Sequence, residues 1–507
     1  MPTLHYRQLV LTLVAAAGVC AFGCGRRDTP ALGPVTMRIG VGAPPKGTPS
    51  AGAANFIKSL MSEPWLTLRP DGREAERIAV RWTWDDSRTT LHLKLRPDVY
   101  FHDGTHLTPG LAAQVLRNSV AEPQQEGVLS FASIRSVTAS GEGSIDITLS
   151  EPNSFVLPDL ALAAVLMPKR ADIGTGPFRI VKRDAGAAVL TAFPQYYRGR
   201  PGVAEIDVMN YPTQRKAWAA LMRSEIDMLY EVSRDAVDFV EAETTVKTYS
   251  FPRPYYIPLV FSVRHPILKN AEVRRAINEA LDKATLIRDG LSGRGRPSDG
   301  PIWPEHWAHS PPPQPFTFNP EAARLRLDAA GLPARLSRDG NMPARFSFTC
   351  LVFANDARFE RLAVLVQKQL ADVGIDMKLL PLTQPELVAR LASGDFDAFL
   401  FEMFGLSLSW TYDFWRSHEG SHINSGYRAA DAVLDRIRGA RSEDDVRAAV
   451  ADLARILHDD PPAAFLAWQA TSRAVSTNFD VAAENNRDIL TNVWQWRPTA
   501  GTKQAAR

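Results

Sequence analysis

Two segments of the chain carry the same residue pattern, and they constrain the fold more than any other feature. Residues 213–229 read TQRKAWAALMRSEIDML and residues 383–399 read TQPELVARLASGDFDAF, with an aspartate in step at Asp227 and Asp397. Each copy predicts a threonine-capped helix followed by a short strand, and each is preceded by a predicted strand, EIDVMNY or GIDMKLLPL. A chance echo is the alternative, but two strand–helix–strand units in separate halves favour two similar α/β lobes.

The stretch FHDGTH places His102 and His106 four residues apart and resembles the H-E-x-x-H motif of zinc metalloproteases, with aspartate in the place of glutamate. That motif requires a helix, because a helix brings both imidazoles onto one face. Here the preceding residues alternate between apolar and polar and predict a strand, and the Asp-Gly pair predicts a turn. The helix starts only at Pro109, with Thr108 as its N-cap. We therefore expect a turn with two polar histidines and no metal site.

A longer stretch around this motif, residues 82–116, resembles the signature of the extracytoplasmic solute-binding proteins of the peptide/nickel class, which deliver ligands to ABC importers. The signature runs through a tryptophan, a polar turn, an alternating strand that ends in Leu-Arg, an aromatic residue, His-Asp-Gly-Thr and a helix. Three further landmarks of that family follow in the same order, at 174–201, 260–287 and 318–332. The resemblance covers most of residues 37–500.

This resemblance implies an α/β fold of the type II periplasmic-binding-protein kind, with two lobes joined by a hinge and an additional domain on the first lobe. The ligand of such a protein sits between the lobes, which close around it. The implied domains are a discontinuous first lobe of 35–60, 165–255 and 476–507, an additional domain of 61–164, and a second lobe of 256–475.

The N-terminus predicts a lipoprotein signal peptide over residues 1–23. Arg7 gives a weakly basic start, residues 9–22 are apolar, and AFGC then places a small residue before Cys24, which resembles a bacterial lipobox. The apolar stretch is too short to span a bilayer comfortably. We expect an acylated Cys24 followed by a polar tether over 24–34, which would hold the chain on the periplasmic or extracellular face of the bacterial cell membrane. An ordinary signal peptide cut nearby is the alternative.

Cysteine count, net charge and missing motifs narrow the class of protein. Cys20 would be discarded and Cys24 lipidated, so Cys350 stands alone and no intrachain disulfide is expected. The formal net charge of +2 argues against an electrostatically driven nucleic-acid binder. No nucleophile elbow, phosphate loop or C-x-x-C motif is present. We expect neither an enzyme nor a cofactor, whereas turnover of peptide substrates would favour a metal-dependent hydrolase.

The resemblance also implies the partners. The chain would capture an oligopeptide or a similar extended polar solute and pass it to an ABC permease with its ATPase subunits. We expect a monomer. A lipoprotein that binds its ligand for sensing or chaperoning without import is the alternative, and permease and ATPase genes beside this one would favour import.

The segment FGLSLSWTYDFWRSH, residues 404–418, is the best candidate for ligand contacts. It follows the strand of the second echoed copy, and strand ends meet the cleft in open α/β sheets. Peptide-binding members of the family hold the ligand's α-ammonium with a Trp-x-x-Asp, which implies Trp410 and Asp413 here. Counting from Asp397, however, places the family position nearer to 403–406.

Six side chains are therefore predicted to bind ligand. Core packing is the alternative for tryptophans such as Trp410, and Arg416 could meet a ligand carboxylate or be a solvated surface charge. Tyr255 and Trp303 are the weaker candidates, because hinge and core positions are the alternative for them. The six are Trp410, Tyr412, Asp413, Arg416, Tyr255 and Trp303.

Overall fold

The computed structural model describes residues 35–42, 51–121, 129–184, 187–233, 236–334, 344–354, 356–418 and 421–499. The predicted signal peptide, the tether and Cys24 lie outside these residues, so their prediction stands untested. Among the helices of the described part, none is both long and apolar enough to cross a membrane.

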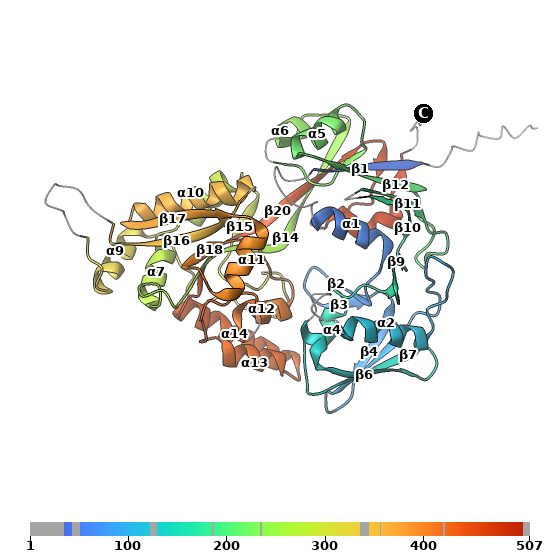
Figure 1. Ribbon diagram of the computed structural model, residues 1–507, viewed down its shortest axis with the longest axis horizontal. Coiled ribbons are helices and arrows are strands. Elements are labelled where there is room, and N and C mark those ends of the chain that lie inside the picture. The colour runs from blue at the N-terminus through green and yellow to red at the C-terminus, as the bar shows by residue number, and fades with distance from the viewer. Residues whose placement is uncertain are drawn as a thin grey trace, which may run out of the picture.

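Two lobes lie on either side of a pair of long strands, β14 (Val246–Phe261) and β20 (Ala463–Ser476) (Figure 1). These strands pair antiparallel and belong to one 12-stranded sheet that runs through both lobes. Two short strands attach at its centre, β15 (Gly295–Pro297) on β20 and β19 (Met403–Phe404) on β14. The other strands follow the order β10 (Phe178–Asp184), β11 (Ala187–Ala192), β12 (Glu205–Tyr211), β1 (Thr36–Gly42), β13 (Met228–Leu229), β20, β14, β18 (Ala398–Leu400), β16 (Phe346–Phe353) and β17 (Ile375–Leu382).

Helices cover the sheet in both lobes (Figure 1). The first lobe has α1 (Ala51–Met61), α5 (Gln214–Met222) and α6 (Val237–Glu241). The second lobe has α7 (Ala271–Glu279), α8 (Lys283–Thr285), a π-helical turn (Leu286–Gly290), α9 (Pro320–Ala329), α10 (Ala357–Ala371), α11 (Gln384–Ser393), α12 (Leu408–Trp415), α13 (Asp431–Arg438) and α14 (Glu443–Asp459). Each lobe buries its own apolar core against its half of the sheet.

A separate four-stranded sheet forms the additional domain, in the order β4 (Ala79–Trp84), β5 (Thr90–Leu95), β7 (Ser144–Leu149) and β6 (Ile134–Ser140). It packs with α2 (Pro109–Ala121) around a core of its own. The sheet falls inside the predicted range 61–164, while the boundaries themselves stay a prediction. Smaller elements complete the fold: β2 (Leu66–Leu68), β3 (Glu74–Glu76), α4 (Val156–Asp159), β8 (Leu166–Met167), β9 (Arg170–Gly174), β21 (Phe479–Asp480), β22 (Arg497–Pro498) and 3-10 helices at 129–133 and 489–495.

The two echoed segments fold alike. In the first copy, β12 and β13 lie on either side of β1 and run parallel to it, with α5 as the connection. In the second copy, β17 and β18 lie on either side of β16, again parallel, with α11 as the connection. The observed architecture, with a third domain beside the two lobes, confirms the predicted two-lobed α/β fold.

The echoed aspartates have the same role in the two lobes. The carboxylate of Asp227 accepts the backbone N–H of Arg38 on β1 at 2.8 Å, and that of Asp397 accepts the backbone N–H of Thr349 on β16 at 2.9 Å. Each aspartate directly precedes the last strand of its unit. The carboxylates thus fix the end of a short parallel strand against its neighbour, where a backbone donor would otherwise lack a partner.

The main-chain carbonyls of the same two aspartates hold the long strands. The carbonyl of Asp227 accepts the N–H of Ser476 at the end of β20, at 2.7 Å, and that of Asp397 accepts the N–H of Ser262 directly after β14, at 2.8 Å. The end of β20 is therefore fixed in the first lobe, and the end of β14 in the second lobe, by the same kind of backbone hydrogen bond. The sequence echo marks a structural symmetry between the lobes.

The FHDGTH stretch forms the predicted turn. The N–H of Gly104 donates to the carbonyl of Phe101 at 2.9 Å, and Gly104 has a φ of +86°, which a side chain would disfavour. The buried ring of His102 accepts the N–H of Gly174 at Nδ1 (3.4 Å), so Nε2 carries the proton that is donated to the carbonyl of Gly176 (3.0 Å). His102 thereby joins the additional domain to the loop that precedes β10.

The other parts of the motif also have structural roles. Nε2 of His106 donates a hydrogen bond to the carbonyl of Pro97 at 2.7 Å. Thr108 caps α2 by accepting the N–H of Leu111 at 3.3 Å, as predicted. Across the described residues, no group of three or more His, Cys, Asp or Glu side chains is arranged to hold a metal ion.

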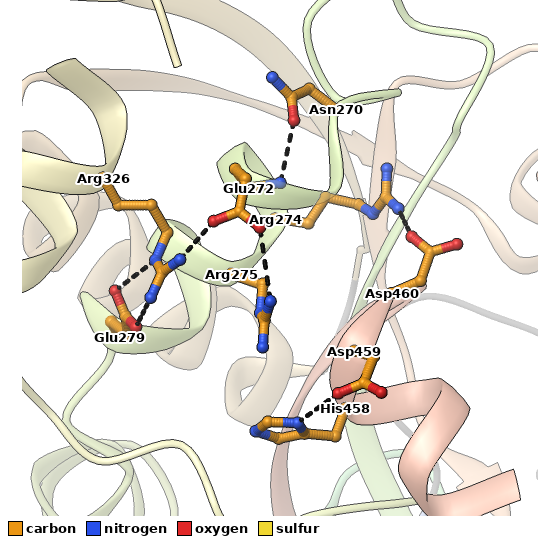
Figure 2. A network of polar contacts seen from close by, with 9 residues as sticks. All are labelled: Asn270, Glu272, Arg274, Arg275, Glu279, Arg326, His458, Asp459 and Asp460. Carbon is orange, nitrogen blue, oxygen red and sulfur yellow. Dashed lines mark hydrogen bonds and ion pairs between the residues drawn. The ribbon is translucent and has the colours of Figure 1, made fainter. Parts of the chain in front are cut away.

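Helix α7 is connected to neighbouring elements on two sides (Figure 2). On one side, Arg326 of α9 donates to both carboxylate oxygens of Glu279, at 2.7 and 3.0 Å, and also pairs with Glu272. On the other side, Arg274 points toward Asp460 and donates to the carbonyls of Leu268 (2.5 Å) and Pro461 (2.7 Å). Only 2% of Arg274 is exposed, so these carbonyls would be left without a donor if it were removed.

We expect Arg274→Leu to lower the free energy of unfolding by about 2–5 kcal/mol, because it leaves two buried carbonyls, and the part-exposed Asp460, without their donor. Urea denaturation followed by circular dichroism measures the change. The matched control is Arg275→Leu on the same helix, whose i,i+3 ion pair with Glu272 at 3.4 Å is part-exposed and worth less than about 1 kcal/mol. Equal losses in both variants would contradict this role.

Candidate functional site

The two long strands cross from one lobe to the other at a break in their ladder. The pairing of β14 with β20 shifts register between Pro252 and Tyr256, and a second proline, Pro254, lies in the gap. Proline has no N–H to give to a ladder, so the strands are least firmly joined here. Side chains around this crossover face both lobes and form a candidate site.

Five polar side chains form a continuous row at the crossover, here called the hinge row. Gln469 of β20 donates to Glu402 at 2.7 Å and accepts from Arg358 at 3.3 Å. Arg253 lies 3.8 Å from the same Glu402, and Arg358 lies 3.8 Å from Glu231 of the first lobe. The row therefore runs from the first lobe through the hinge into the second.

The ion pairs at the two ends of the hinge row are long, although Arg358 is also held in its own lobe by Asp356, to which it donates at 2.6 Å. A separation of 3.8 Å is too long for a hydrogen bond, so these two pairs are held by charge attraction alone. The side chains of Arg253 and Glu402 are 25% and 22% exposed, and those of Arg358 and Glu231 are 38% and 35% exposed. A bound molecule with charged ends could therefore form ion pairs with these part-exposed side chains.

A row of half-buried aromatic rings extends from the hinge row along the second lobe. The guanidinium of Arg253 lies over the ring of Tyr255 at 4.4 Å. Ring centroids then follow at 5.2 Å from Tyr255 to Phe404, 6.2 Å from Phe404 to Trp410, and 5.3 Å from Trp410 to Phe414. Such spacings are those of paired aromatic rings, and the row offers an apolar wall beside charged groups.

Helix α12 separates the predicted site residues instead of gathering them. Tyr412 donates to Asp435 at 2.9 Å, and Arg416 pairs with the same carboxylate at 2.9 and 3.1 Å. The ring of Tyr412 also packs edge-on against Phe155 of the additional domain at 5.5 Å. Both side chains face α13, away from Trp410.

Trp303 lies in the core beside the aromatic row, where its backbone N–H donates to the carbonyl of Gly405, next to Phe404, at 2.8 Å. It is 4% exposed and packs edge-on against Trp468 at 5.0 Å, with the guanidinium of Arg296 over its ring at 4.4 Å. Its surroundings are those of a core residue. The structure thus brings Tyr255 and Trp410 into one aromatic row, pairs Tyr412 with Arg416 through Asp435, and buries Trp303 behind that row without a ring contact to the other five.

Asp413 of α12 lies within the electrostatic influence of Asp159, a buried carboxylate of the additional domain. Asp159, 1% exposed, accepts hydrogen bonds from Ser130 (2.6 Å), Ser409 (2.6 Å) and Ser407 (3.3 Å), so serines of both the additional domain and the second lobe hold it. Burial raises the pKa of Asp159 to about 6, against the lowering effect of the serine donors. Burial, and then the charge of Asp159, raise the pKa of Asp413 to about 7.

Sequence reasoning missed all five members of the hinge row and the carboxylate of Asp159. Their positions in the chain are far apart, and nothing in the local pattern connects them. The one available signal was the proline pair in PRPYY, which interrupts a long apolar stretch. The missed residues are Arg253, Glu231, Arg358, Glu402, Gln469 and Asp159.

A family model and a curated relative both match this chain, and both are described as binding proteins. The model of the family described as bacterial extracellular solute-binding proteins, family 5, middle, matches residues 75–425. The oligopeptide-binding protein AppA of Bacillus subtilis is 24% identical over 452 residues, which cover 81% of each chain.

Solved structures share the fold over nearly the whole chain. NikA from Brucella suis, in complex with Fe(III)-EDTA, superposes with a TM-score of 0.80 at 21% identity and covers 92% of this chain and 100% of its own. The binding protein AgaA from A. tumefaciens R10, in complex with agropinic acid, gives a TM-score of 0.75 at 19% identity and covers 92% and 99%.

The buried carboxylate of Asp413 makes stability depend on pH. Its pKa is about 7 in the folded chain but about 3.9 when unfolded, so the folded state binds more protons between these values and stability falls as pH rises through this window. We expect Asp413→Asn to be more stable than the parent chain by about 1–3 kcal/mol at pH 8 and to differ little at pH 4, as measured by urea denaturation.

The control for this measurement is Asp435→Asn, which should act in the opposite direction. Burial opposes it, but Arg416 and Tyr412 hold the pKa of Asp435 below its ordinary value, so the ionised carboxylate stabilises the fold at neutral pH. A parent chain whose stability rises from pH 5 to 7 in a way that depends on Asp413 would contradict the assignment.

Proposed function

The chain belongs to family 5 of the bacterial extracellular solute-binding proteins, and from this membership we propose that it captures a solute for an ABC importer without catalysing a reaction. The hinge row is the observation that carries the proposal. It connects the lobes through part-exposed charges of both signs, so a solute that binds there changes the contacts on which lobe closure depends.

We propose that the solute is an oligopeptide or a similarly extended polar molecule. A peptide has a cationic and an anionic end, and the hinge row offers carboxylates and guanidinium groups for both. The aromatic row beside it suits side chains of varied shape. Among related proteins, one is named for oligopeptides, while two others were solved with agropinic acid and with Fe(III)-EDTA, so opines and metal chelates belong in the same screen.

The proposed contacts refine the six predicted residues. Tyr255 and Trp410 are proposed as the aromatic wall. Asp413 is proposed as the partner of a ligand ammonium, because a buried carboxylate that faces another carboxylate is stabilised by a cation. Tyr412 and Arg416 shape the site through Asp435, and Trp303 supports it from the core.

We expect tripeptides to raise the unfolding midpoint of the protein in a thermal-shift screen, since a ligand at about 100 times its Kd adds about 2.7 kcal/mol to stability. Glu402→Gln should weaken peptide binding by about 1–3 kcal/mol, because it removes one charge from the hinge row. The surface variant Asp452→Asn, with its exposed pair to Arg436, should bind like the parent chain.

Two outcomes would overturn parts of this proposal. A midpoint that responds to an opine or a chelate but to no peptide removes the peptide assignment and leaves solute capture intact. Uptake of the identified solute that is unchanged when the gene is deleted removes the import role and favours ligand binding for sensing or chaperoning.

The membrane anchor is a separate proposal and rests on the sequence around Cys24 alone. We expect the chain to incorporate labelled palmitate in bacterial cells and to sediment with membranes, and we expect Cys24→Ser to abolish both. The adjacent variant Gly25→Ser is the control and should keep label and sedimentation. A Cys24→Ser chain that retains the label and stays on membranes would refute the anchor.

A further inference from the structure

A cavity of about 310 Å³ lies between the additional domain and the second lobe, apart from the hinge row. Its volume reaches the lower end of the range typical of ligand pockets. Strand β4 and the loop after β2 form one wall, and the residues around α12 and the turn between α13 and α14 form the other. Three indole rings line it, those of Trp82, Trp84 and Trp307.

The two walls are joined at the rim by an ion pair. Arg73 of the additional domain donates to both carboxylate oxygens of Glu443 at the start of α14, at 2.6 and 3.0 Å. The guanidinium groups of Arg73 and Arg447 lie over the ring of Trp307 at 4.9 and 5.4 Å. The cavity is therefore complete only when the additional domain and the second lobe are in contact.

Arg88 is the unusual residue of the lining. It has a φ of +60°, in the left-handed region, which costs a residue with a side chain about 1–2 kcal/mol and costs glycine nothing. Within the described residues its guanidinium makes no hydrogen bond or ion pair. A strained backbone that carries a free cation into a cavity is a sign of a functional position, because glycine in the same turn would give a more stable fold.

The charges that line the cavity favour an anion. Three arginines, Arg73, Arg88 and Arg441, stand against two carboxylates, Glu74 and Glu443. Burial raises the pKa of Glu74, which weakens its opposition to an anionic guest. Burial also lowers the pKa of the lining residue His306 to about 4, so its imidazole is neutral.

We propose that this cavity is a second binding site, for a planar apolar molecule that carries one carboxylate. The carboxylate binds the guanidinium of Arg88, and the ring system lies among the indoles of Trp82, Trp84 and Trp307. Arginine recognises carboxylates through two parallel N–H donors, and aromatic rings pair with indoles at van der Waals distance. The site goes beyond solute capture at the hinge and shares no residue with the hinge row.

Isothermal titration of the mature protein with indole-3-acetate tests this proposal, and indole serves as the uncharged reference. We expect indole-3-acetate to bind at least tenfold more tightly than indole. Arg88→Gly should remove this preference and, at the same time, raise the unfolding midpoint of the unliganded protein, because the strain in the turn is relieved. The exposed neighbour Arg81→Gly is the control and should keep the preference.

Other outcomes decide against the site. Equal affinity for the two compounds in the parent chain, or an Arg88→Gly chain that binds indole-3-acetate as well as the parent does, overturns the proposal. Glu402→Gln should leave the affinity for indole-3-acetate unchanged, and Arg88→Gly should leave the affinity for the hinge solute unchanged. The two sites can therefore be tested independently. Loss of indole-3-acetate binding in Glu402→Gln would place the compound in the hinge cleft instead.

Discussion

The antiparallel ladder between β14 and β20 is the interaction on which the rest of the structure depends. It is the connection that makes one sheet of two lobes, and it is fixed at each end by the backbone carbonyl of an echoed aspartate, Asp227 or Asp397. Between these fixed ends the ladder is broken around Pro252 and Pro254, where prolines offer no N–H and the two strands are least firmly joined. The hinge row lies at that break.

The second lobe contacts the first lobe and the additional domain through two chemical kinds of interaction. Those of the hinge row and the Arg73–Glu443 pair are part-exposed and exchange readily with water, so they cost little to separate. Those around Asp159 are buried and bring a second carboxylate, Asp413, close by. The contact between the additional domain and the second lobe therefore places like charges together, and a proton or a cation relieves their repulsion.

The family signature in residues 82–116 combines positions with structural roles and one position, Arg88, for which we propose a role in binding. His102 and Thr108, which resembled parts of a metalloprotease motif and a helix start, have structural roles: one joins the additional domain to the first lobe, and the other caps α2. Arg88, by contrast, has a φ of +60°, a left-handed conformation that glycine would adopt at lower cost. A residue that costs the fold stability is a better guide to function than a residue that stabilises it.

The sequence by itself determined the elements and the symmetry of the lobes. Periodicity, caps and turns depend on neighbouring residues, so the helix at Thr108 and the two units around Asp227 and Asp397 followed from local pattern. Only the tertiary structure decided the site. The hinge row joins Glu231, Arg358 and Gln469 from distant parts of the chain, and α12 points Asp413 and Arg416 in different directions. Which side chains converge depends on how the sheet crosses the hinge, and no local spacing encodes that crossing.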